Sequence, residues 1–296
     1  MTSPSPAAAS VETPSASSKA SPTASPSASA APFPALAPDG GPWLLALHSS
    51  AETLGVALQR LGGDEAPRLA AFPLGRGLSG ALFDCVESVL PASRWSALGR
   101  LAVATGPGGF TGTRLTVALA RTLAQQLQLP LDGIGSFQLI AERLRRTGAV
   151  AARPFWVVQE LPRRGLVAGL YAPGATGEGG AAPIAVVPPA PPACVAETLA
   201  AAAAGSPQLS ASAAFALLEL SAPRLYREAS ALAEAEAALL PGSEDVPALR
   251  CPAEVRQPDD VAELLRCSQA AAAAGLPAPW SPVLPLYPTS PVDGAP

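Results

Sequence analysis

The sequence predicts an α/β protein made of two related layers. Two short apolar segments, 43–48 and 54–59, are separated by a polar turn, which is typical of a β-hairpin. An apolar segment at 100–104 then leads through a glycine-rich turn into a run of good helix formers at 113–127. A second hairpin in the later half begins the same pattern again. Antiparallel strands that feed into alternating strands and helices, twice over, favour an α/β fold.

The other elements of the first half follow from apolar spacing and helix boundaries. Leu78, Leu82, Val86 and Val89 recur at helical spacing and predict a helix over 77–90. A proline three residues after Leu127 closes the helix at 113–127. The remaining expected elements are strands at 68–74 and 131–135 and a helix at 136–146, which Ser136 would cap.

The second half carries a weaker pattern. Strands are expected at 155–158 and 166–171, joined by a turn that contains Arg163, Arg164 and Gly165. Beyond Tyr171 the sequence is rich in glycine and proline, and only approximate elements can be assigned. These are helices near 193–203, 224–239 and 258–273 and an extended, proline-punctuated tail at 282–288. We expect one subdomain at 41–150 and a second at 151–296, with a boundary near 148–153.

Composition sets the protein's first 40 residues apart. The 296 residues include 35 prolines and 26 glycines, and segment 1–40 is dominated by Ser, Ala, Pro and Thr. Glu12 and Lys19 are the only charged residues before residue 30, so the segment has little to bury and is expected to be disordered. It lacks the pattern of a secretory signal or transit peptide, and no apolar run reaches the length of a membrane helix. The expected location is the cytoplasm, away from the membrane.

Residue counts exclude several kinds of chemistry. With a single histidine, His48, the chain cannot build a two-histidine metal site or a Cys₂His₂ zinc finger. The four cysteines lack a Cys-x-x-Cys pair, which favours reduced thiols. A net charge of −4 gives no global reason to bind a nucleic acid backbone. Any metal chemistry would therefore rest on carboxylates alone.

The most informative motif is the glycine-rich turn after the strand at 100–104. It does not match a P-loop, because Gly112 is followed by Thr113 and Arg114, and it does not match the dinucleotide fingerprint. An anion site at the following helix N-terminus stays open. We favour a structural turn with Thr111 or Thr113 capping that helix. The motif residues are Gly106, Pro107, Gly108, Gly109, Phe110, Thr111, Gly112 and Arg114.

Three segments carry a resemblance to a known family. Residues 44–52 and the glycine motif at 105–114 resemble the first strand and the glycine signature of the TsaB family, and residues 129–136 are similar to the strand that follows. This family is the dimerisation subunit of the bacterial tRNA threonylcarbamoyladenosine synthase. The resemblance covers residues 43–147 well, and beyond them only 155–171 and 285–287 weakly.

The resemblance implies an actin, Hsp70 and sugar-kinase type (ASKHA) fold whose active site has been lost. It also implies a non-catalytic scaffolding role, with no catalytic residue, no metal and no cofactor. The partners would be the catalytic paralogue TsaD and the ATPase-type subunit TsaE, with tRNA contacted only through the complex. The protein alone could form a homodimer. The alternative is an enzyme of the same fold, either a small-molecule kinase or a glycoprotease-like hydrolase.

In the family, the helices at 77–90 and 113–127 resemble those that pack against the partner subunit. Both have apolar or small residues on more than one face, although full burial within the monomer is the competing interpretation. The candidate interface residues are Leu78, Leu82, Val86, Val89, Leu115, Ala118 and Arg121.

Two further candidates have ordinary explanations that we favour. His48 stands where the family usually has Asp, and we expect a hydrogen-bonded strand-end residue there in preference to a general base. The basic cluster of Arg143, Arg145 and Arg146 suits a helix C-terminus and lacks the interleaved aromatic residues of a nucleic acid site.

Overall fold

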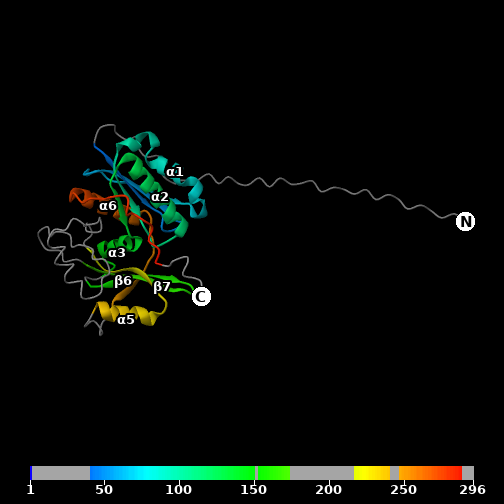
Figure 1. The fold of residues 1–296 in the computed structure, drawn as a ribbon, viewed down its shortest axis with the longest axis vertical. Coiled ribbons are helices and arrows are strands. Elements are labelled where there is room, and N and C mark those ends of the chain that lie inside the picture. The colour runs from blue at the N-terminus through cyan, green and yellow to red at the C-terminus, as the bar shows by residue number, and fades with distance from the viewer. Residues whose placement is uncertain (2–40, 151–152, 174–216, 241–246, 289–296) are drawn as a thin grey trace.

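The computed structural model describes residues 1, 41–150, 153–173, 217–240 and 247–288 of the chain. Within these residues, helices and two mixed β-sheets alternate in layers (Figure 1). The α/β prediction is confirmed. The disordered arm expected at 1–40, apart from Met1, and the helix expected at 193–203 lie outside the described residues.

The first sheet is built around its buried central strand. The strands are β1 (Trp43–His48), β2 (Thr53–Arg60), β3 (Arg68–Pro73), β4 (Leu98–Ala104) and β5 (Leu131–Ile134), in the order β3-β2-β1-β4-β5. β1 pairs antiparallel with β2 and parallel with β4, which forms the expected hairpin and crossover. Every residue of β1 is buried, as expected for a continuous apolar run covered on both faces.

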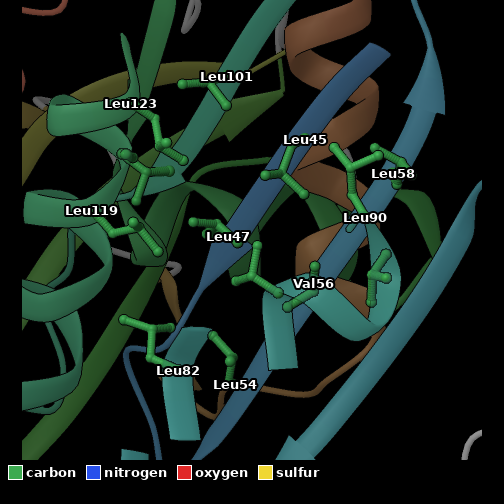
Figure 2. Close-up of a cluster of buried hydrophobic side chains, with 14 of the residues drawn as sticks. Leu45, Leu47, Leu54, Val56, Leu58, Leu82, Leu90, Leu101, Leu119 and Leu123 are labelled. Atoms are coloured by element: carbon green, nitrogen blue, oxygen red, sulfur yellow. The ribbon is translucent and has the colours of Figure 1, made fainter. Parts of the chain in front are cut away.

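Helices cover both faces of this sheet. The 3₁₀ helix η1 (Gly75–Gly77) leads into α1 (Leu78–Val89), and η2 (Ala92–Ala97) precedes β4. α1 and α2 (Phe110–Leu127) pack on one face around Leu45 and Leu47, and Figure 2 shows this cluster of leucines and valines. On the opposite face, Leu44 and Ala46 contact the cluster that includes α6 (Asp259–Ala273).

The second sheet lies beyond α6 and α3 (Ser136–Arg146) (Figure 1). Its strands are β6 (Phe155–Leu161), β7 (Gly165–Pro173), β8 (Leu217–Tyr226) and β9 (Leu249–Pro252), in the order β8-β7-β6-β9. α5 (Ala229–Leu239) covers its outer face around Trp156 and Leu232. One core lies between the two sheets, because α3, α6 and both sheets share a single buried cluster.

Three expectations from the sequence were wrong. The helix expected at 224–239 begins only at Ala229, since residues up to Tyr226 belong to β8, which pairs along β7. The sequence analysis assigned no element to the residues of β9. α2 begins at Phe110, ahead of the expected start at Thr113. The strand errors share a cause: pairing with β7 and β6 outweighs local propensity, and that pairing is not visible in a short stretch of sequence.

α6 does not stay with the second sheet. Although it follows β9 in the chain, it packs on β1, β2 and β4 of the first sheet. The segment at 276–288 that follows α6 also returns to the first sheet, where the Leu131 amide donates to the Ala278 carbonyl at 2.8 Å. The division at residue 150 remains a prediction, and the packing of the first sheet includes elements from both sides of it.

Candidate functional site

The glycine motif packs against the turn between β1 and β2. A Cβ atom at Gly108 would lie 2.2 Å from the Ser50 carbonyl oxygen, and one at Gly112 would lie 2.5 Å from the Ser49 carbonyl oxygen. Real Cβ atoms do not approach this closely, so only glycine fits at these two positions. Gly106 has a φ of +94°, which also favours glycine. The glycines therefore let two backbone segments meet.

Hydrogen bonds fix this junction. The Gly109 amide donates to the Ser50 carbonyl at 2.6 Å, and the Ser136 amide donates to the Gly106 carbonyl at 2.7 Å. The Ser50 and Ser136 hydroxyls lie 2.5 Å apart. From the C-terminal segment, the Leu286 amide donates to the Thr105 carbonyl at 2.7 Å. The motif thus joins the β1–β2 turn, the start of α3 and the tail.

The expected caps do not form. Gly109 is the N-cap of α2, without a side-chain hydrogen bond, and Thr111 and Thr113 lie inside the helix. Ser136 likewise is the first residue of α3, with Gly135 as the cap, and its hydroxyl binds Ser50 instead. These residues are held by tertiary contacts, a signal that the local sequence does not contain.

A cleft of about 580 Å³ lies beside the glycine motif. One wall comes from the β1–β2 turn, η1 and the start of α2, and the other includes Gln159, Ala253 and Val255 near the second sheet. Its charged lining residues are Glu52 and Arg76. The described residues contain no group of three or more His, Cys, Asp or Glu side chains that could hold a metal ion. Glu52 is the one carboxylate among the residues that line this cleft.

His48 is fully buried at the end of β1. His48 is paired with Gly55 on β2. The Gln257 side chain and Val261 pack directly over Gly55. The His48 Nδ1 accepts the Ser50 amide at 3.5 Å, and among the described residues its Nε2 has no hydrogen-bond partner. Burial lowers the pKa of the imidazole to about 3. The side chain is neutral and closed to substrate, which does not suit a general base.

The arginines at the end of α3 are paired with carboxylates. The Arg143 Nε donates to Asp260 at 2.6 Å, and Arg145 binds Glu142 through both oxygens. Arg146 pairs with Glu263 on α6. The carboxylates of all three pairs are buried, so this cluster joins α3 to α6 and does not form an open basic surface.

The candidate interface residues divide into two groups. Leu78, Leu82, Val86 and Val89 are buried in the core against the first sheet, so these four are not available to a partner. Their helical spacing marks the inner face of α1, which was the competing interpretation. Ala118 is exposed, and Leu115 and Arg121 are half-buried on α2.

The outer face of α1 carries residues that the sequence analysis did not select. Phe83 is 55% exposed, and Asp84 and Glu87 are exposed beside it. A phenylalanine among acidic residues on a helix already rich in apolar positions could have indicated this second face. On α2 the exposed Arg114 lies over the Phe110 ring, with its guanidinium carbon 4.9 Å from the ring centre.

Comparison with solved structures defines the class of fold. The chain is similar to YeaZ from Pseudomonas aeruginosa, with a TM-score of 0.51 and 18% identity over 83% of this chain and 99% of that one. A second structure, described as an uncharacterized protein with similarity to peptidase YeaZ from the same organism, gives a TM-score of 0.52 and 18% identity, and covers 84% and 100%. The fold is thus ASKHA-like, as expected.

Sequence comparison with known proteins tests the family resemblance. The chain is 34% identical over 102 residues to the tRNA threonylcarbamoyladenosine biosynthesis protein TsaB of Bacillus subtilis. The match covers 33% of this chain and 43% of that protein. Residues 75–159 also match the family model of TsaD, described as tRNA N6-adenosine threonylcarbamoyltransferase. The resemblance to the TsaB family is confirmed.

Proposed function

We propose that this protein is a non-catalytic subunit that binds a TsaD-type paralogue and so supports the synthesis of threonylcarbamoyladenosine in tRNA. The similarity to Bacillus subtilis TsaB carries the proposal. The TsaD family match extends from η1 to β6 and includes α1 and α2, which is compatible with two proteins of related fold. TsaE would join the same assembly, and tRNA would be contacted through the complex.

The site supports a scaffolding role better than an enzymatic one. The glycine motif packs closely against the backbone of the β1–β2 turn, and His48 is buried and neutral. The cleft offers Glu52 and Arg76 but no cluster of metal ligands among the described residues. A kinase or glycoprotease of this fold remains the alternative, and saturable nucleotide binding or hydrolysis that depends on His48 would favour it.

The surface that we assign to the partner is the outer face of α1 and α2. It combines the exposed Phe83 with the small, exposed Ala118, which permits close helix packing. α1 presents Asp84 and Glu87, whereas α2 contains arginines and no acidic residue. A face with one acidic and one basic helix suits a partner of related fold, and a second copy of the chain could occupy it in the absence of that partner.

The proposal is tested by mixing the full chain with the TsaD-type subunit of the same organism. Size-exclusion chromatography with light scattering should show a new heterodimer peak. Phe83→Glu should weaken it because a buried, unpaired carboxylate is unfavourable in an interface. Ala118→Glu should weaken it because the larger side chain prevents close helix packing.

Matched controls separate the interface from a general effect of added charge. Leu249→Glu places a carboxylate on an exposed apolar residue of β9, and Ala233→Glu places one on an exposed alanine of α5. Both controls should bind like the unchanged chain. Absence of a complex at micromolar concentration would contradict the proposal, as would equal losses in the controls.

A further inference from the structure

A groove runs along α2 and includes Ala118 of the proposed partner face. It has a volume of about 350 Å³ and lies between α2 and residues 276–288, which we call the C-terminal strap. The strap contributes Trp280 and Pro285, and Leu284 beside them is 60% exposed. The α2 residues that line the groove are Arg114, Val117, Ala118, Arg121, Thr122 and Gln125.

The charged side chains that line this groove are all cationic. α2 has two arginines and no acidic residue in its 18 residues, and the strap contains no charged residue. Neither Arg114 nor Arg121 forms an ion pair with a carboxylate in the part of the chain that the structure describes. In a protein with a net charge of −4, this is a local cationic surface.

Both guanidinium groups are held in place. Arg121 donates to the Val283 carbonyl at 3.1 Å and lies 5.8 Å from the centre of the Trp280 ring. Arg114 lies over Phe110. A planar guanidinium fixed in this way loses little freedom when its remaining N–H groups bind a carboxylate. The two arginines are two helical turns apart, about 10 Å along one face of α2.

We propose that the groove binds a carboxylate-bearing, partly apolar segment of the TsaD-type partner. The inference rests on the proposed function for the identity of that partner, and it adds the chemistry of the contact. Leu284 and Pro285 supply apolar area next to the two cations. Two acidic side chains about 10 Å apart on one helix face of the partner would match the spacing of the arginines.

A single-stranded nucleic acid fits the groove less well. Bases require open aromatic faces, but the Phe110 ring already contacts Tyr287, at 5.0 Å between ring centres, as well as Arg114. The Trp280 ring likewise faces Arg121. Two cations also give little electrostatic affinity for a phosphate backbone.

Two neighbouring glutamines allow a matched test. Gln125 lines the groove, whereas Gln126 is exposed and is not among the residues that line it. Gln125→Glu and Gln126→Glu are isosteric and add the same charge. Affinity of the full chain for the TsaD-type subunit is measured by biolayer interferometry at 50 and 300 mM NaCl.

We expect Gln125→Glu to weaken binding about tenfold at 50 mM NaCl and less at 300 mM, because salt screens the repulsion. Gln126→Glu should change the affinity less than about threefold. The double variant Arg114→Gln/Arg121→Gln should weaken binding at least as much as Gln125→Glu. Its control, Arg164→Gln/Arg250→Gln, removes two exposed charges elsewhere and should have little effect.

Other outcomes would overturn the inference. Equal affinities of the two glutamate variants would remove the groove from the interface while the proposed function stands. Binding of a 12-nucleotide single-stranded RNA that Gln125→Glu selectively abolishes, with partner affinity unchanged, would assign the groove to nucleic acid. Loss of a homodimer alone would assign it to a second copy. If the unchanged chain fails to bind the TsaD-type subunit, the proposed function fails, and this inference fails with it.

Discussion

The close approach of the glycine motif to the β1–β2 turn can be tested by adding one methyl group. In Gly108→Ala, the new Cβ would lie 2.2 Å from the Ser50 carbonyl oxygen and 2.5 Å from the Ser50 Cβ. An ordinary contact needs about 3.4 Å or more, so the backbone must separate by roughly 1 Å. The neighbouring Gly109 is a matched control, because a Cβ there would lie 3.5 Å from the same oxygen.

The expected loss of stability has two parts. Forcing an extra carbon into a packed site costs about 1–3 kcal/mol. Separating the segments also weakens the 2.6 Å bond from the Gly109 amide to Ser50 and the contact between the Ser50 and Ser136 hydroxyls, each worth about 1 kcal/mol. We expect Gly108→Ala to lower the free energy of unfolding by about 2–4 kcal/mol, and Gly109→Ala to lower it by less than about 1 kcal/mol.

Equilibrium unfolding in urea, followed by tryptophan fluorescence, measures both variants. The difference between them matters more than either value, since both replace a glycine next to the start of α2. If Gly108→Ala and Gly109→Ala agree within about 0.5 kcal/mol, the contact with Ser50 does not limit the residue type, and the argument for a structural turn is refuted.

Two further predictions concern buried charge. Burial lowers the pKa of His48 to about 3, below its ordinary 6.5, so the folded protein binds fewer protons and loses stability as the pH falls from about 6.5 towards 3. Because His48 is the only histidine, its imidazole resonances can be followed directly by NMR, and a titration midpoint above pH 5.5 would contradict the prediction. For Glu142, burial raises the pKa, but hydrogen bonds and attraction from Arg145 and Arg266 outweigh it and hold the pKa below its ordinary value. The ionised carboxylate therefore stabilises the fold above the unfolded-state pKa, and this contribution is lost as the pH falls through the folded-state pKa. Glu142→Gln should cost about 2–3 kcal/mol at pH 7 and flatten the acid limb of the stability profile, whereas the exposed Glu87→Gln should change stability by less than about 0.5 kcal/mol. Equal stabilities of these two variants at pH 7 would show that the buried network contributes nothing.

Local sequence patterns predicted most of the first sheet and its helices. The uniform burial of β1 follows from an apolar run, and α1 follows from apolar residues at helical spacing. α2 ends at Leu127, and its C-cap Gln128 has a φ of 55°, two residues before Pro130. Each of these signals lies within a few residues of the element that it predicts. The motif segments that indicate the TsaB family are local in the same sense.

The pairing of distant segments could not be obtained in this way. β8 and β9 exist because β7 and β6 lie beside them, and residues 217–226 show no comparable pattern on their own. The partners of Arg143, Arg145 and Arg146 include carboxylates on α6, more than a hundred residues away. An arginine cluster has the same appearance in a sequence whether it is paired or free.

The sequence by itself determined the order of elements, the glycine motif, the lack of a histidine pair for metal binding and the family resemblance, because each depends on residue type and short spacing. Only the tertiary structure decided which face of each helix is available. Leu82 and Phe83 are adjacent and both apolar, yet one packs on the sheet and the other is exposed. The reason is physical: an apolar residue loses contact with water only where another surface covers it, and that surface comes from elsewhere in the chain.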